Sequence, residues 1–137
     1  MRNTQIPLFT PETEWVMPDS LKDLKGYKEI AIDLETNDPN LLSLGSANVA
    51  GDGHIVGVAV AVDGWKGYYP VAHEGGGNMD KKLVYAWLQD IFNQTETTFI
   101  FHNAMYDVCW LRREGLSLKG HIVDTMIAAS LIDENRL

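Results

Sequence analysis

The sequence has almost no cysteine and no long apolar segment, and both shortages limit where the protein works. Cys109 is the one cysteine among 137 residues, so no disulfide forms within the chain, which is typical of a reducing compartment. The longest apolar run, from Ile55 to Val62, is much shorter than the roughly 20 residues that span a bilayer. The N-terminal residues lead into no apolar signal segment. We therefore expect a cytoplasmic protein that does not contact a membrane.

Positive charge is also scarce. The chain has 11 Lys and Arg residues against 19 Asp and Glu residues, which gives a net charge of -8 at pH 7. A nucleic-acid-binding domain that acts alone normally carries a basic patch, so this charge by itself counts against binding of DNA or RNA. The same charge is expected if the carboxylates hold metal ions, or if the basic surface belongs to a neighbouring domain. Composition alone leaves both explanations open.

The length and the 45% hydrophobic content predict a single folded domain with one core. Residues 1–17 contain Pro7 and Pro11 and show no clear hydrophobic period, so we expect an extended N-terminal arm there. Residues 18–137 are expected to form the domain itself.

The hydrophobic pattern of residues 18–137 predicts strands first and then alternating helices and strands. Asp19, a capping candidate, opens a short predicted helix that ends near Gly26. The turn pair Asp63-Gly64 joins the second and third strands as a hairpin. The predicted elements after the short helix are strands 29–34, 54–64 and 65–73, helix 80–93, strand 97–103, helix 104–115, strand 121–123 and helix 124–135. This βββ-α-β-α-β-α order predicts an α/β fold, a mixed sheet with helices packed on its faces.

Three acidic residues lie where predicted strands end and helices begin. Asp33 and Glu35 close the first strand, and Asp107 lies in the first turn of the helix that follows strand 97–103. Side chains two apart in a strand point to the same face, so Asp33 and Glu35 can approach one spot. Adjacent carboxylates repel each other unless a cation lies between them, and Mg²⁺ or Mn²⁺ prefers such oxygen ligands. The pair therefore indicates either a metal site or an ordinary solvated strand end.

The segment FHNAMYD, residues 101–107, also has two interpretations. Asn103 at a strand exit is typical of a helix cap, Tyr106 of a core aromatic residue, and Asp107 of an acid that favours a helix N-terminus. The same three residues are also placed to build a site beside Asp33 and Glu35, because loops at strand ends present side chains from a rigid scaffold.

Four segments occur in an order that resembles a known family. They are the apolar strand that ends in Asp33-Leu34-Glu35, YYPVAH at residues 68–73, FHNAMYD at residues 101–107 and VDTMIAASLI at residues 123–132. Together they resemble the 3'-5' proofreading exonuclease domain of family A DNA polymerases, the DNA polymerase I type, and bacteriophage members most of all. The resemblance covers residues 18–137. It implies a ribonuclease H-like fold and hydrolysis of the 3'-terminal phosphodiester of DNA, with release of nucleoside monophosphates.

The resemblance implies a catalytic site with two divalent metal ions, Mg²⁺ or Mn²⁺. Asp33 would bridge both ions, Glu35 would hold the ion that activates the attacking water, and Asp107 would hold the second ion, partly through water. In-line displacement uses such a pair, because one ion makes a hydroxide and the other stabilises the leaving 3' oxygen.

Three further residues match segments of the family that bind or surround the substrate. Thr36 would touch the terminal nucleotide, and Asn103 and Tyr106 would shape the substrate site. The implied partners are the 3' end of single-stranded DNA and a polymerase domain, in the same chain or in a separate one.

One motif of the family is missing from the sequence. Family members carry a downstream Tyr-x-x-x-Asp whose Asp completes the metal site, but only 30 residues follow Asp107 and none of them forms this pattern. Asp124 matches the family's own DTM segment, where a helix cap is expected, and Asp133 lies in a polar tail. We therefore expect an incomplete domain, truncated at its C-terminus, with weak or no activity by itself. A truncated face would expose apolar surface, so self-association is a further hypothesis.

Two alternatives stay open. The Asp-x-Glu and Asn-x-x-Tyr-Asp pattern also resembles RNA-trimming exonucleases of the same superfamily. The chain would otherwise be a catalytically silent module that binds DNA or docks a polymerase domain. Metal binding separates the enzymes from the silent module, and preference for a deoxyribose 3' end separates the two enzymes.

Overall fold

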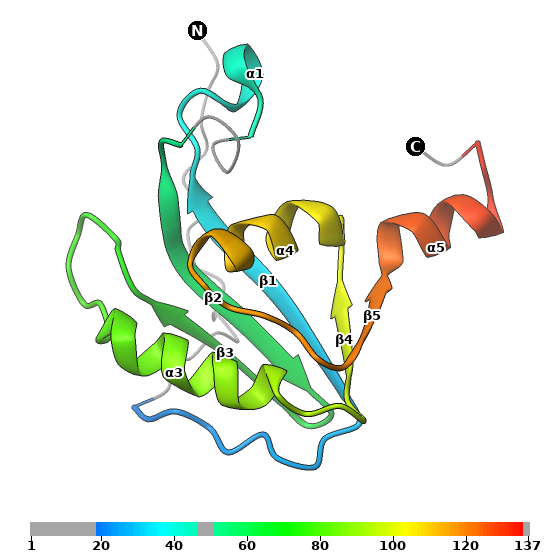
Figure 1. The fold of residues 1–137 in the computed structure, drawn as a ribbon, viewed down its shortest axis with the longest axis horizontal. Helices are drawn as coiled ribbons and strands as arrows, with labels where there is room; N and C mark the ends of the chain where they lie inside the picture. Colours follow the sequence, from blue (N-terminus) through cyan, green and yellow to red (C-terminus); the bar gives the residue numbers. More distant parts are fainter. Residues whose placement is uncertain (1–18, 47–50, 136–137) are drawn as a thin grey trace, which may run out of the picture.

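The computed structural model describes residues 19–46 and 51–135 and shows a five-stranded sheet with helices (Figure 1). The strands are β1 (Glu29–Asn37), β2 (His54–Val62), β3 (Trp65–Pro70), β4 (Thr98–Phe101) and β5 (His121–Asp124). The helices are α1 (Leu41–Leu44), α3 (Lys81–Phe92), α4 (Ala104–Arg113) and α5 (Thr125–Ile132). The predicted α/β class, the order of the strands and the three later helices are confirmed.

The sheet is mixed, as predicted, and β1 is its central strand in the order β3-β2-β1-β4-β5. Neighbours pair antiparallel from β1 to β3 and parallel from β1 through β4 to β5. A tight turn suffices between antiparallel strands, whereas parallel strands need a crossover, here α3 and α4. In the hairpin Val62 pairs with Trp65, and Gly64 in the turn has a φ of 74°, which glycine adopts without steric cost.

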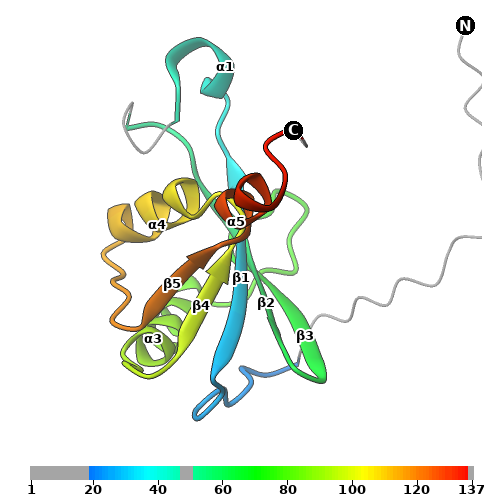
Figure 2. The same cartoon turned by 90° about the vertical axis from the view of Figure 1, so that its right-hand side faces the viewer.

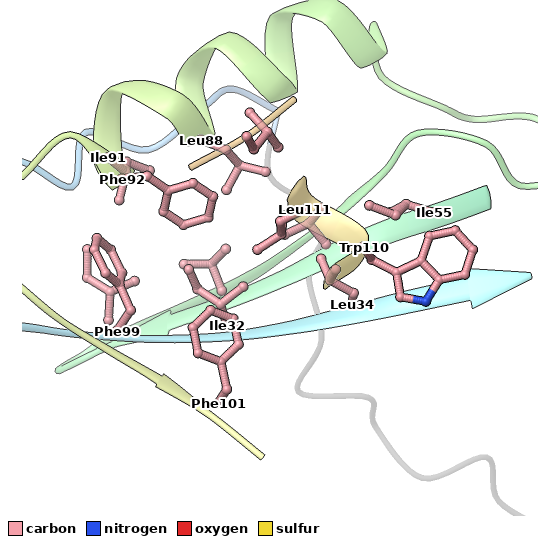
Figure 3. Close-up of a cluster of buried hydrophobic side chains, with 14 of the residues drawn as sticks. Ile32, Leu34, Ile55, Leu88, Ile91, Phe92, Phe99, Phe101, Trp110 and Leu111 are labelled. Atoms are coloured by element: carbon pink, nitrogen blue, oxygen red, sulfur yellow. The ribbon is translucent and has the colours of Figure 1, made fainter. Parts of the chain in front are cut away.

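The helices α3 and α4 pack on one face of the sheet (Figure 2). The Asp80 side chain caps α3 by accepting hydrogen bonds from the backbone N–H groups of Lys82, at 2.8 Å, and Leu83, at 3.3 Å. The rings of Phe92 in α3 and Phe99 in β4 meet edge to face, with their centroids 5.3 Å apart. Figure 3 shows the core that results between the helices and the sheet, and burial of each large side chain there stabilises the fold by about 1.5–3 kcal/mol.

The opposite face of the sheet has no described helix over it (Figure 2). Small residues of β1, β2 and β3 make this face shallow and line a cavity of about 630 Å³; they are Ala31, Ala59, Ala61 and Gly67. The helix α5, although mostly apolar, has no buried residue and lies at the end of β5 (Figure 1). None of the described helices combines the length and apolar character needed to cross a membrane.

The short helix predicted near residues 19–26 is wrong for the described residues, which form no helix there. Backbone N–H and C=O groups that would form hydrogen bonds within a helix bind side chains of distant residues instead. The Lys22 N–H donates to the Tyr69 hydroxyl at 3.2 Å, and the Lys22 carbonyl accepts from the Trp87 ring N–H at 2.8 Å. Leu24 is buried against the core. The one-turn helix α1 was not predicted, and the expected arm, residues 1–17, lies outside the described residues.

Candidate functional site

The strand β1 separates core residues from acidic residues by simple alternation. Ile32 and Leu34 are buried, whereas Asp33 and Glu35 are exposed, so the two carboxylates share the open face of the sheet. The pairing between β1 and β2 shifts directly after Glu35, which faces Gly57, while the next residue, Thr36, faces Ile55. Such a β-bulge redirects side chains and is frequent beside functional sites.

Asp107 reaches this strand from the first turn of α4. Only 3% of its surface is exposed, and its Oδ1 accepts a hydrogen bond of 3.2 Å from the backbone N–H of Leu34. The strand β4 pairs with β1 only from Glu29 to Ala31. Beyond Ala31, the carboxylate of Asp107 accepts the hydrogen bond from the Leu34 N–H that a neighbouring strand would otherwise accept. The contact joins residues 73 positions apart and fixes α4 to the end of β1.

Two carboxylates influence each other at this junction. Burial, and then the negative charge of Asp33, raise the pKa of Asp107 to about 6, although the hydrogen bond from the Leu34 N–H acts to lower it. Mutual repulsion of this kind is relieved by a cation with a preference for oxygen ligands. The donor set at the end of β1 therefore suits Mg²⁺ or Mn²⁺.

The three predicted metal ligands are not all gathered in one cluster. Within residues 19–46 and 51–135, no group of three His, Cys, Asp or Glu side chains is arranged to hold a metal ion. The structure couples Asp33 with Asp107 electrostatically, and it places Glu35 two residues along the same exposed face as Asp33.

Thr36 and Tyr106 meet in a small polar network beside the acids. The Tyr106 hydroxyl donates to Oδ2 of Asp38 at 3.1 Å and lies 2.8 Å from the Thr36 hydroxyl, which then donates to it. Tyr106 is thus only half-buried and polar in its contacts, rather than a purely apolar core residue. Asp38 was missed by the sequence reasoning, because an acid in a polar turn has no distinguishing pattern.

Asn103 occupies the N-cap position of α4, but its side chain makes no capping hydrogen bond. It is the only non-glycine residue with positive φ in the described part of the chain, with φ 67°. The carboxylate of Asp124 does the capping instead, by accepting from the N–H groups of Asn103, at 3.0 Å, and Ala104, at 2.8 Å. The expected capping side chain of α4 was therefore wrong, since a residue from β5 supplies it, and the Asn103 amide stays exposed.

Asp124 also caps α5, as predicted, through a 2.9 Å hydrogen bond from the N–H of Met126. One carboxylate thus serves two helix N-termini. Desolvation acts to raise the pKa of Asp124, but hydrogen bonds from backbone N–H groups, first that of Ala104, outweigh it and lower this pKa below its ordinary value. These contacts give Asp124 the capping role that was expected for it.

The sequence is similar to a known protein family and to known polymerases. A family model described as 3'-5' exonuclease matches residues 9–137. A DNA-directed DNA polymerase of Pseudomonas phage M6 is 37% identical over 141 residues, which cover 98% of this chain and 21% of the phage protein. DNA polymerase I of Borreliella burgdorferi is 27% identical over 124 residues, which cover 90% of this chain and 13% of that protein. The chain thus spans less than a quarter of the length of these relatives.

Solved structures with a similar fold are nucleases. NrnC of Brucella melitensis with bound Mg²⁺ has a TM-score of 0.51 and 22% identity, over 77% of this chain and 45% of that chain. The catalytic core of RRP6 from Trypanosoma brucei has a TM-score of 0.51 and 24% identity, over 74% and 24%. RNase D of the same organism, in complex with RNA U12, has a TM-score of 0.55 and 17% identity, over 78% and 33%. These likenesses concern the fold, and they confirm the predicted ribonuclease H-like class.

Proposed function

The chain belongs to the 3'-5' exonuclease family of family A DNA polymerases, and from this we propose that it is the proofreading part of such a polymerase. Its reaction would be hydrolysis of the 3'-terminal phosphodiester of DNA, with release of nucleoside monophosphates. The observation that carries the proposal is the junction of β1 and α4, where the buried Asp107 faces the charge of Asp33. We propose residues 18–137 as the exonuclease part and residues 1–17 as its arm.

The proposed metal ligands are Asp33, Glu35 and Asp107. Two bound divalent ions, Mg²⁺ or Mn²⁺, would supply a hydroxide at neutral pH and charge stabilisation for the leaving 3' oxygen. Asp33 would contact both ions, Glu35 one and Asp107 the other. The raised pKa of Asp107, about 6, means that its carboxyl group is mostly protonated below that pH in the metal-free chain. The ionised form, which binds metal ions, predominates only above that pH. Glu35 needs only a side-chain rearrangement to join, because it already lies on the face of Asp33.

We propose that Thr36, Tyr106 and Asn103 bind or frame the terminal nucleotide. The hydrogen bonds from Thr36 to Tyr106 and from Tyr106 to Asp38 tie α4 to the end of β1, and this keeps Asp107 directed at the strand. The exposed Asn103 amide lies at the exit of β4, beside the first turn of α4. Preorganised polar groups of this kind orient a substrate without further ordering cost.

The proposed partners are the 3' end of single-stranded DNA and a polymerase domain, in the same chain or in a separate one. DNA is favoured over RNA because the relative above 30% identity is a DNA polymerase, whereas the structural likeness to RNase D concerns the fold. We expect weak activity from these 137 residues alone, since no Tyr-x-x-x-Asp follows Asp107 and loss of one member of a cooperating set costs orders of magnitude in rate. We also propose a cytoplasmic location.

One observation favours a second candidate, a catalytically silent module that docks a polymerase domain. It is the absence, among the described residues, of a ready three-ligand cluster. Self-association through the truncated face is a related proposal, and light scattering that shows only monomer at high concentration would exclude it.

The decisive experiment is a calorimetric titration of Mn²⁺ into the chain and into Asp33→Ala. Asp90→Ala is the matched control, because Asp90 is an exposed acid on α3. We expect binding that disappears in Asp33→Ala and persists in Asp90→Ala. The same proteins are then incubated with 5'-labelled single-stranded DNA or RNA and Mg²⁺. Shortening of DNA from its 3' end supports the enzyme, and absence of metal binding by the wild-type chain supports the silent module.

A further inference from the structure

Tyr68 on β3 lies near Glu35 although a whole strand separates them. Across the hairpin Tyr68 pairs with Ala59, and Pro70, two residues further, pairs with Gly57. Gly57 in turn faces Glu35 across the ladder between β2 and β1. The side chain of Tyr68 therefore approaches Glu35 if it extends along β2 toward Gly57.

The absence of a side chain at Gly57 makes this approach possible. A Cβ atom at that position would lie 2.0 Å from the Tyr68 hydroxyl oxygen and 2.3 Å from the ring carbon that bears it, so the phenol occupies the space above Gly57. The φ of Gly57 is not positive, and its backbone therefore does not require glycine. What requires glycine is the close approach of the phenol. Burial and then the charge of Glu35 raise the pKa of this phenol, in agreement with their proximity.

His73 holds the phenol from its other side. Its Nε2 lies 2.6 Å from the Tyr68 hydroxyl oxygen, and the two rings meet edge to face with centroids 5.7 Å apart. The backbone of His73 is fixed by Asn78, whose Oδ1 accepts from the His73 N–H at 2.7 Å and whose Nδ2 donates to the His73 carbonyl at 2.8 Å. The glycine-rich loop 73–78 thus serves to hold an imidazole against a phenol.

We propose that Tyr68 is a positioning residue for Glu35, with His73 as its support; this rests on the function proposed above. In this arrangement His73 donates its Nε2–H to the phenol oxygen, and the phenol donates its single O–H to the Glu35 carboxylate. Both hydrogen bonds can form at once, because a tyrosine hydroxyl donates one hydrogen bond, here to Glu35, and accepts another through a lone pair, here from His73. The hydrogen bond limits the rotamers of Glu35 on the face that it shares with Asp33, and this lowers the ordering cost when Glu35 rearranges to bind the ion.

The test is the Mn²⁺ dissociation constant, measured by calorimetry on the full chain. Partners that hydrogen-bond a metal ligand typically contribute about 10–100-fold in affinity, so Tyr68→Phe is expected to weaken binding by about tenfold. Tyr69→Phe is the matched control, because Tyr69 is the next residue of β3 and its hydroxyl accepts from Lys22 within the core. This control should leave the dissociation constant unchanged.

A cycle with Glu35→Gln distinguishes positioning from a structural role. If Tyr68 acts through Glu35, Tyr68→Phe causes no further loss of affinity once Glu35→Gln is present. Gly57→Ala, which displaces the phenol without removing it, should reproduce the loss seen with Tyr68→Phe. His73→Gln keeps an N–H donor and should retain more affinity than His73→Leu.

The outcomes separate the two proposals. Equal affinity in the wild type and Tyr68→Phe, or an equal loss with and without Glu35→Gln, overturns the role of Tyr68 and leaves the proposed function standing. Absence of Mn²⁺ binding by the wild-type chain overturns the proposed function, and the role of Tyr68 with it.

Discussion

The two faces of the sheet differ in what covers them and in what they carry. One face lies under α3 and α4 and buries Ile30, Ile32 and Leu34 of β1. The other face is uncovered in the described part of the chain, and there the same strand carries Asp33 and Glu35. A single strand thus supplies the core and the candidate site in alternate positions. Stability and proposed chemistry can therefore be altered separately, one residue apart.

The largest expected effect contrasts these faces directly. Leu34→Ala removes a buried side chain and should lower the free energy of unfolding by about 2–5 kcal/mol. Glu35→Ala, on the open face, should change it by less than about 0.5 kcal/mol. Urea denaturation followed by circular dichroism measures both. Equal losses from the two substitutions would mean that the open face is packed as the covered face is.

The next largest effect tests Asp107, the only acidic residue that is buried in the described part of the chain. Its pKa is raised to about 6, so the folded state holds this proton more tightly than the unfolded state. The stability from this group is complete below pH 3.8 and is lost as pH rises through about 6, by roughly 3 kcal/mol at most. Asp107→Asn, which keeps an oxygen for the Leu34 N–H, should therefore stabilise the metal-free chain at pH 7 and have little effect at pH 3.

Thermal unfolding of the wild type and Asp107→Asn across this range checks the sign. The informative quantity is the difference in stability between the two proteins. The pKa of Asp124 is lowered, so the stability that Asp124 contributes is lost as pH falls, and this contribution cancels in the difference. A wild-type chain that is more stable than the variant at pH 7 would contradict the prediction.

A smaller effect is expected at the edge where the helical layer meets the sheet. Asp124→Ala removes one carboxylate that caps α4 and α5, and loss of a capping side chain destabilises the helix N-terminus that it served. Because α4 is packed and α5 is exposed, hydrogen exchange should increase far more at the start of α5 than at the start of α4. Equal increases in the two helices would show that packing does not support α4 independently of the cap.

The smallest expected effect concerns Tyr106, which links α4 to the end of β1. Tyr106→Phe removes the hydroxyl that contacts Thr36 and Asp38 and should cost about 1 kcal/mol. Chemical denaturation measures the change, with Tyr85→Phe on α3 as the control, since the Tyr85 hydroxyl is buried and has no hydrogen-bond partner among the described residues. That control should not destabilise the chain.

Local pattern was enough to predict most of the fold. The spacing of apolar residues changes from alternating to helical near residue 80, and this change predicted where strands give way to helices. The spacing is informative because it reflects which side chains face the core. The common face of Asp33 and Glu35 follows from the same geometry of a strand. The cap of α5 by Asp124 follows from local chain geometry as well.

The features that sequence did not predict depend on distant contacts. The segment before β1 has the pattern of a short helix, but hydrogen bonds with Tyr69 and Trp87 hold Lys22 in another conformation. The second role of Asp124, as the cap of α4, depends on β5 lying beside β4. The phenol of Tyr68 extends toward Glu35 through the space above Gly57, which pairs with Glu35 on the neighbouring strand. No local period contains such information.

The hydrogen bond between the Leu34 N–H and Asp107 makes one backbone amide a natural probe of the candidate site. This amide is buried, and its partner is the carboxylate that the proposed ions would contact. Its ¹H–¹⁵N resonance therefore reports on the ionisation of Asp107 and the docking of α4 without any label at the carboxylates. A shift of the Leu34 amide resonance during a pH or Mn²⁺ titration would therefore report ionisation of Asp107 or metal binding beside it.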